Sequence, residues 1–155
     1  MITIHGEISE IQNGFNEIVN HLSAFKLQKD IKINVKKSDK DVFVKCDKSE
    51  AVIEYNKPIN FFRALGQMIC ALSENDSFVI EEREVFETMG CSPEINLNKF
   101  SIEGHKAWFR YMAVLGLDTY LMSIPCAYKV EGYPYFGYMS GAYTPEEIKE
   151  TVAYA

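Results

Sequence analysis

The chain has 155 residues, which is about one domain by the prior of ~150 residues per domain and too short for a complete (β/α)8 barrel of roughly 250 residues. Hydrophobic residues make up 47% of the sequence and charged residues 25%, so a sizeable core is expected and wholesale disorder is excluded. The 16 basic and 22 acidic residues give a net charge of −6, the wrong sign for a general nucleic-acid binder or for a protein that binds anionic membranes.

No segment has the length and apolarity of a membrane span. The most apolar run, residues 61–72, is interrupted by Arg63, whereas a span needs about 18 consecutive apolar residues. The first ten residues carry Glu7 and Glu10 where a signal peptide has basic residues and then an apolar stretch. We therefore expect a cytoplasmic protein without a transmembrane segment.

The cysteines and histidines form no metal or redox motif. No pair of cysteines has the CxxC spacing, and no histidine has a second His, Cys or Asp one helical turn away. We expect reduced and mostly buried thiols, and we predict no metal and no other cofactor. The residues concerned are Cys46, Cys70, Cys91, Cys126, His5, His21 and His105.

Residues 1–88 have the pattern of several short strands. An alternation of apolar and polar side chains is typical of half-buried strands. This pattern occurs at residues 31–36, 42–45, 51–56 and 78–87, and residues 2–5 are expected to form a further short strand. Short polar turns separate the three middle segments, so we expect them to form an antiparallel meander.

Two helices are predicted between these strands. Apolar residues recur at helical spacing over residues 7–25, and a second stripe begins at Pro58, which suits a first helical turn, and ends at Leu72. The resulting order βαβββαβ predicts a two-layer α+β domain, with an antiparallel-rich sheet and both helices on one face. The acidic group Glu81, Glu82 and Glu84 is interpreted as a solvated strand face.

From residue 89 the pattern changes to that of β/α units. Ser101 is a suitable N-cap for a helix that ends at Gly116. Its predicted buried face consists of Trp108, Phe109, Met112 and Leu115. The nearly all-apolar segment 119–124 predicts a parallel strand that is covered on both sides.

A long aromatic loop follows at residues 125–143. It is much longer than the usual connection of about 4–6 residues, and loops of that length are commonly functional. The sequence Thr144-Pro145-Glu146-Glu147 then matches a capping box with proline at the first helical position. The helical pattern reaches Ala155 without a glycine stop, as expected of a helix that is cut short.

Four segments resemble glycoside hydrolase family 20 (GH20), the β-N-acetylhexosaminidases. They are 86–90 (FETMG), 110–117 (RYMAVLGL), 128–138 (YKVEGYPYFGY) and 143–149 (YTPEEIK). The resemblance extends over the whole chain. It implies that residues 1–88 are the small α/β domain that precedes the barrel in that family, and that residues 89–155 are the first two β/α units of an incomplete barrel.

The resemblance implies exo-hydrolysis of terminal β-linked N-acetylhexosamines. In that family the substrate's own acetamide attacks the anomeric carbon, an aspartate orients it, and an adjacent glutamate protonates the leaving oxygen. This sequence contains no Asp-Glu dipeptide. The segment 94–98 lacks the arginine with which the family holds the sugar, and Asn96 or Leu97 stands at that position. The segment 123–127 lacks the acidic residues that related enzymes have there.

These departures predict a truncated or degenerate relative without catalytic residues of its own. One alternative is the N-terminal fragment of an active enzyme whose Asp-Glu pair lies beyond residue 155. Another is a carbohydrate-binding or self-assembly module. Tyr133, Tyr135 and Tyr138 are the candidate residues for an N-acetylhexosamine-containing glycan, with Trp108 as a further stacking ring; packing within the loop and core is the competing interpretation. Self-association is expected through residues 89–155.

Overall fold

The structure is a computed structural model that describes residues 1–25, 30–93, 100–122, 128–138 and 141–155. The chain divides into two compact units. The first contains Met1–Met89 and Arg110–Asp118, and the second contains Gly90–Phe109 and Thr119–Ala155. The domain limits 1–88 and 89–155 stay a prediction.

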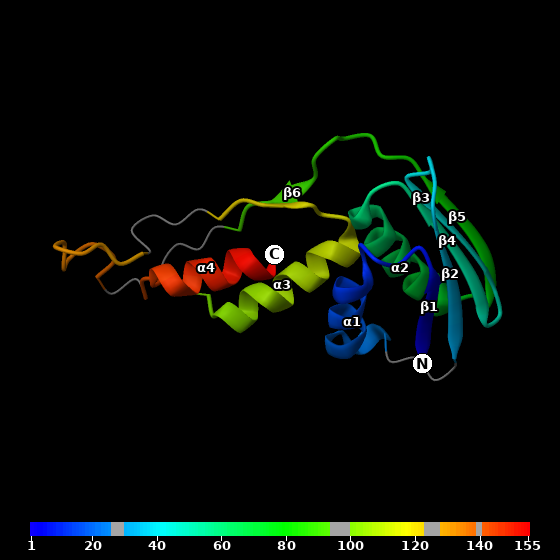
Figure 1. The fold of residues 1–155 in the computed structure, drawn as a ribbon, viewed down its shortest axis with the longest axis horizontal. Coiled ribbons are helices and arrows are strands. Elements are labelled where there is room, and N and C mark those ends of the chain that lie inside the picture. Colours follow the sequence, from blue (N-terminus) through cyan, green and yellow to red (C-terminus); the bar gives the residue numbers. More distant parts are fainter. Residues whose placement is uncertain (26–29, 94–99, 123–127, 139–140) are drawn as a thin grey trace. The chain divides into compact units, whose positions relative to one another are not determined.

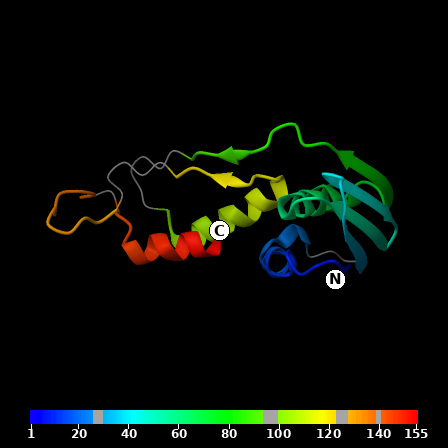
Figure 2. The same ribbon diagram turned by 45° about the horizontal axis from the view of Figure 1, so that its top comes forward.

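The first unit is a mixed five-stranded sheet with its helices on one face (Figures 1 and 2). The predicted α+β class and the order βαβββαβ are confirmed. The strands are β1 (Ile2–Gly6), β2 (Ile31–Lys37), β3 (Val42–Asp47), β4 (Glu50–Tyr55) and β5 (Ser77–Glu82). Buried and exposed side chains alternate along β2, as expected where helices cover only one face.

The predicted antiparallel meander is wrong. The strands lie in the order β1-β2-β4-β3-β5, so β2 pairs with β4 in parallel and does not neighbour β3. The antiparallel pairs are β3 with β4 and β3 with β5, and in both of them β3 is one of the strands. The alternating pattern fixes which face of a strand is buried, but it carries no information about which strand lies beside it.

The first helix is shorter than predicted. Helix α1 covers Gln12–His21, and a 3-10 turn, η1 (Ser23–Phe25), follows it. Residue 7 cannot begin the helix because Gly6 has a φ of 104° and the Glu7 carboxylate accepts the Lys37 backbone N–H at 2.7 Å. The apolar side chains predicted for this stretch are nevertheless buried against the sheet, among them Phe15 and Ile18.

Helix α2 (Pro58–Leu72) has the predicted limits, with proline in its first turn. The last strand of the sheet, in contrast, ends at Glu82 and not at residue 87. Its partner β3 begins at Val42, which pairs with Glu82, so the ladder between the two strands ends at that residue. The prediction that the acidic group at residues 81, 82 and 84 is a solvated strand face is also wrong in part. The Arg63 guanidinium donates to both Glu82 carboxylate oxygens, at 3.0 and 3.2 Å.

The second unit contains a two-stranded parallel ladder and two helical segments. Strand β6 (Gly90–Cys91) pairs with β7 (Thr119–Tyr120), and helix α4 covers Pro145–Tyr154. Helix α3 (Ile102–Leu115) contributes residues 102–109 to this unit and residues 110–115 to the first. The strand predicted at 119–124 is only two residues long within the described residues, and Leu121 is exposed.

The limits of α3 agree with the predicted signals, but its buried face does not. The Ser101 hydroxyl accepts the Gly104 N–H at 3.0 Å, and Gly116 ends the helix with a φ of 79°. Trp108 is 42% exposed and Leu115 54% exposed, so these two are wrongly placed in the core. In the part of the chain that the structure describes, no helix has both the length and the apolarity that crossing a membrane requires.

Candidate functional site

A fully buried histidine connects the elements of the second unit. His105 lies on α3 and has no exposed surface. Its Nε2 atom is 2.9 Å from the Tyr143 hydroxyl, and its Nδ1 atom is 3.2 Å from the Tyr120 hydroxyl on β7. The His105 side chain therefore bonds to Tyr120 on strand β7 and to Tyr143, which lies directly before the N-cap of α4.

The hydrogen bonds of Tyr143 determine the tautomer of this histidine. The Tyr143 hydroxyl donates its single proton to the Phe100 carbonyl at 2.8 Å and accepts the Phe100 N–H at 2.8 Å. Because that proton is used, the contact to Nε2 requires His105 to donate there. Nδ1 is then an acceptor, and Tyr120 donates to it. All three groups are satisfied when His105 is neutral.

Burial favours the same protonation states. It lowers the pKa of His105 and raises the pKa of Tyr120 to about 12. It also raises the pKa of Tyr143, against the opposing effect of its hydrogen bond with the Phe100 backbone. No acidic side chain among the described residues hydrogen-bonds to the imidazole. A neutral group without a charged neighbour is suited to holding structure, not to acid–base chemistry.

Aromatic rings surround the histidine. The rings of Phe100, Tyr120 and Tyr143 lie at centroid distances of 5.2, 5.9 and 5.7 Å from the imidazole. Phe109 stacks on it at 6.3 Å and continues to Tyr154 of α4 at 6.5 Å. Such ring pairs stabilise a core by ~0.5–1.5 kcal/mol each beyond their buried area. The histidine is thus the centre of an aromatic core.

This core fixes both ends of a loop. We call residues 128–143 the tyrosine loop, of which 139–140 lie outside the described residues. Tyr128 and Tyr143 form an isolated parallel β-bridge, and the Lys129 N–H donates to the Tyr143 carbonyl at 3.0 Å. Inside the loop the Tyr128 and Phe136 rings meet edge to face at 5.3 Å. The two ends of the tyrosine loop are therefore joined, and Tyr143 at this junction is buried.

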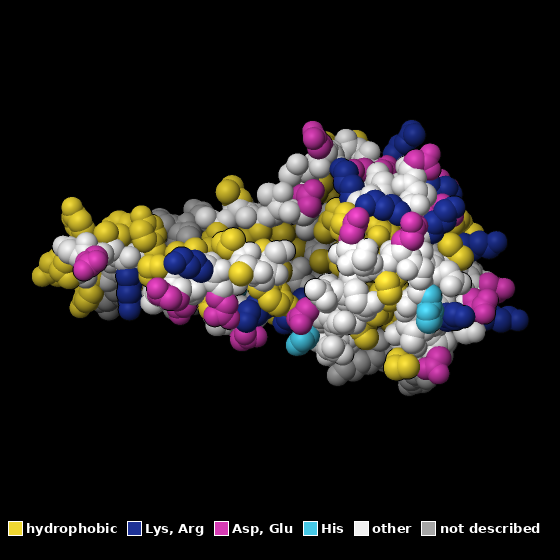
Figure 3. Space-filling model, in the orientation of Figure 1, with side chains coloured by type: hydrophobic (Ala, Val, Ile, Leu, Met, Phe, Trp, Pro, Cys, Tyr) yellow, Lys and Arg dark blue, Asp and Glu magenta, His cyan; other side chains and the backbone are white. Residues whose placement is uncertain are grey.

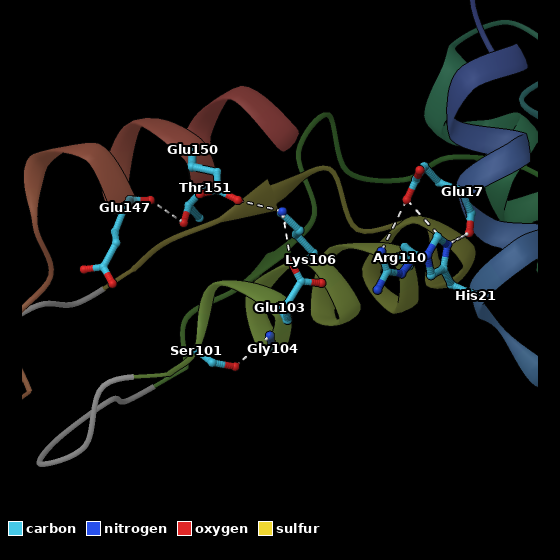
Figure 4. Close-up of polar contacts among 10 residues, drawn as sticks. All are labelled: Glu17, His21, Ser101, Glu103, Gly104, Lys106, Arg110, Glu147, Glu150 and Thr151. Atoms are coloured by element: carbon cyan, nitrogen blue, oxygen red, sulfur yellow. Dashed lines mark hydrogen bonds and ion pairs between the residues drawn. The ribbon is translucent and has the colours of Figure 1, made fainter.

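Hydrogen bonds and an ion pair also hold α4, the helix that follows the tyrosine loop. The predicted capping box at Thr144 and Glu147 is confirmed, with both reciprocal hydrogen bonds present. On α3, Lys106 donates to Glu103 at 3.0 Å and to Glu150 of α4 at 2.7 Å (Figure 4). Hydrogen bonding to these two carboxylates, Glu150 first, raises the pKa of Lys106. The position of α4 determines where the loop ends.

The tyrosines predicted to bind a sugar lie on the outer surface of the loop. Tyr133, Tyr135 and Tyr138 are 67%, 85% and 70% exposed. Tyr133 and Tyr138 line an open hollow of about 450 Å³ together with Lys129 and Phe136, and Tyr135 meets Tyr138 at 6.4 Å without lining it. Figure 3 shows hydrophobic side chains gathered at this end of the second unit. Exposed rings beside a concave surface are suited to stacking on a ligand.

Other predicted features do not join this site. The Trp108 indole donates to the Cys91 sulfur at 3.3 Å and does not line the hollow. Segments 94–98 and 123–127, where the family's arginine and acidic residues are replaced, lie outside the described residues. Cys46 is buried as expected but Cys70 is exposed. Within the described ranges, no group of three or more His, Cys, Asp or Glu side chains could hold a metal.

Sequence reasoning missed His105 and Tyr143, which determine the shape of the site. His105 has no partner at helical spacing, and its two hydrogen-bonding partners lie 15 and 38 residues away in the chain. The only local signal was the position of Tyr143 directly before the capping box. Lys129 was also missed, because a single lysine in a loop gives no pattern.

A smaller hollow of about 240 Å³ occurs in the first unit. Its lining includes Arg63 and Glu82, which pair with each other, and Glu84, which accepts from Lys57 at 2.7 Å. These ion pairs stabilise the segment after β5, and the described lining of this hollow contains fewer aromatic rings than that of the tyrosine loop. The tyrosine loop is the better candidate site.

No known family profile and no curated protein sequence matches the chain. Its fold is similar to that of a GH20 exo-β-N-acetylglucosaminidase from Vibrio harveyi, solved in complex with N-acetylglucosamine, at a TM-score of 0.71 and 15% identity. An inactive mutant of that enzyme gives the same values. The match covers 99% of this chain and 30% of that one. An enzyme of family GH138 that targets pectin rhamnogalacturonan II is similar at a TM-score of 0.56 and 9% identity, over 99% of this chain and 22% of that one. The chain thus has the fold of part of a GH20 enzyme.

Proposed function

We propose that the chain is a relative of the GH20 β-N-acetylhexosaminidases that binds N-acetylhexosamine-containing glycans and does not hydrolyse them by itself. The observation that carries the proposal is the tyrosine loop, which presents exposed rings beside a hollow while its base is fixed in the core. The fold similarity supports the same ligand class, since the Vibrio harveyi enzyme was solved with N-acetylglucosamine bound.

The absence of catalysis rests on the carboxylates. Substrate-assisted hydrolysis needs one carboxylate that stays ionised and an adjacent one that remains protonated until it acts. This sequence has no Asp-Glu dipeptide. The capping Glu147 carboxylate is occupied by the Thr144 N–H at 2.7 Å, and Glu150 pairs with Lys106. These groups hold α4 in place and are not available to protonate a leaving group.

Binding is tested by calorimetric titration with triacetylchitotriose. Tyr133→Ala and Tyr138→Ala should each weaken binding by ~0.5–1.5 kcal/mol, since each removes an aromatic surface on which a sugar can stack. Tyr133→Phe and Tyr138→Phe keep the rings and are the matched controls. Equal losses from the alanine and phenylalanine variants would contradict stacking and point to hydrogen bonding by the hydroxyl groups.

Hydrolysis is tested with a chromogenic N-acetylglucosaminide. The purified chain should release no chromophore above the buffer control. Turnover that disappears after a point mutation in this chain would contradict the non-catalytic half of the proposal, because it would identify a catalytic group within these 155 residues.

A second candidate follows from the extent of the match. The chain spans about 30% of the length of the first matched structures, so it fits equally well as the N-terminal part of an active exo-β-N-acetylhexosaminidase. Sequencing the gene downstream of codon 155 separates the two. An open frame that adds further β/α units with an Asp-Glu pair would favour the active enzyme, and a stop codon would favour the stand-alone binder.

A further inference from the structure

Among the described residues that line the hollow of the tyrosine loop, one side chain is charged, and it is basic. Lys129 lines the hollow beside the rings of Tyr133, Phe136 and Tyr138. The remaining lining residues are uncharged. No described side chain forms an ion pair with Lys129. The hollow thus combines stacking surfaces with a cation that has no counter-charge of its own.

One acidic side chain accompanies Lys129 in this part of the sequence, and it lies outside the lining of the hollow. Between residues 123 and 143 the only charged side chains are Lys129 and Glu131. Glu131 is exposed and does not line the hollow. The net charge of −6 belongs to the chain as a whole, and at 0.1 M salt its effect is screened beyond ~10 Å. Lys129 is therefore the charged side chain that the described lining of the hollow offers to a ligand.

The main chain fixes the position of this lysine. The Lys129 N–H donates to the Tyr143 carbonyl at 3.0 Å, directly after the bridge between Tyr128 and Tyr143. Tyr143 is buried and bound to His105. The backbone of Lys129 therefore lies at the end of the loop where Tyr128 and Tyr143 pair, and the hydrogen bond to Tyr143 holds it there. Only the side chain itself has to be ordered when a ligand binds, which limits the entropic cost.

We propose that the tyrosine loop selects N-acetylhexosamine glycans that carry an anionic group, either a carboxylate or a sulfate, and that Lys129 binds that group. The inference rests on the proposed function, because it specifies the ligand of the same loop. The rings stack on a sugar face while the ammonium forms a charge-assisted hydrogen bond with the anion. The hollow, about 450 Å³ in volume, lies within the range of ~300–1,000 Å³ for small-ligand sites.

The test compares four ligands on the full chain by calorimetry. Triacetylchitotriose is neutral, a hyaluronan tetrasaccharide carries carboxylates, and 6-sulfated N-acetylglucosamine carries a sulfate, with unsulfated N-acetylglucosamine as its size-matched reference. The wild type should bind the anionic member of each comparison more tightly, and Lys129→Met should weaken that binding by roughly five- to tenfold. Neutral ligands should be affected less than twofold. If only the carboxylated sugar or only the sulfated sugar binds more tightly than its neutral reference, that anionic group is the one that the loop selects.

Glu131→Gln is the matched control, because it removes a charge from the same loop outside the hollow. It should leave the anion preference unchanged or increase it slightly. Raising the salt concentration should reduce the preference of the wild type but not the affinity of Lys129→Met. Equal binding of neutral and anionic sugars, unaffected by Lys129→Met, would overturn this inference and leave the proposed function intact. No binding of any sugar would overturn both.

Discussion

The anchor at Tyr143 gives the sharpest stability prediction. Tyr143→Phe keeps the buried ring and removes only the hydroxyl, which has three partners: the Phe100 N–H at 2.8 Å, the Phe100 carbonyl at 2.8 Å and His105 Nε2 at 2.9 Å. At a net value of ~1 kcal/mol for each lost hydrogen bond, the substitution should cost roughly 3 kcal/mol of the free energy of unfolding. The loss is large because Tyr143 is 1% exposed and His105 has no exposed surface, so water is kept from replacing the hydroxyl at Nε2.

The assay is urea unfolding followed by fluorescence. Trp108 is the only tryptophan of the chain and lies on α3 in the second unit, one turn from His105. Tyr138→Phe is the control, since its hydroxyl is on an exposed residue, and its effect should be within about 0.5 kcal/mol of zero. A Tyr143→Phe variant whose stability also lies within that margin of the wild type would refute the anchoring argument.

Three further predictions concern the same unit. His105 should stay neutral to a lower pH than a free imidazole because burial lowers its pKa, so protonation of the unfolded chain below about 6.5 makes stability fall with decreasing pH by up to ~1.4 kcal/mol per unit; 15N shifts showing that the folded imidazole protonates at or above the pH of a free imidazole would contradict this. Thr144→Ala removes one half of the capping box and should destabilise α4 by about 1 kcal/mol, measured by hydrogen exchange, whereas unchanged exchange rates would show that the box is not needed. The β6 and β7 ladder has two strands, and its unpaired edges lead us to expect self-association through residues 89–155; light scattering that gives a strict monomer at millimolar concentration would exclude it.

Much of the first unit could be predicted from local patterns. All five strands were predicted, four of them from period-two segments, and proline placed the start of α2 at the observed residue. The order of the strands could not be predicted, because the alternation in residues 31–56 is compatible with β2 beside either β3 or β4. The end of β5 at Glu82 also depends on a partner strand, and such a limit is not encoded in the segment itself.

The candidate site was predictable only at its surface. A run of tyrosines in a long loop pointed to Tyr133, Tyr135 and Tyr138, and all three are exposed. The core beneath them could not be inferred, since His105 and Tyr143 meet only after α3 and the loop have folded together. The same limitation explains the error at Trp108, which helical spacing alone could not assign to one side of α3.

The central claim is that the tyrosine loop binds an N-acetylhexosamine glycan without cleaving it. The most direct measurement is a titration of the 15N-labelled chain with triacetylchitotriose, with the sugar recovered and analysed afterwards. We predict amide shifts concentrated in residues 128–143, together with quantitative recovery of intact trisaccharide. Unchanged spectra at millimolar sugar, or release of N-acetylglucosamine by the purified chain, would contradict the claim.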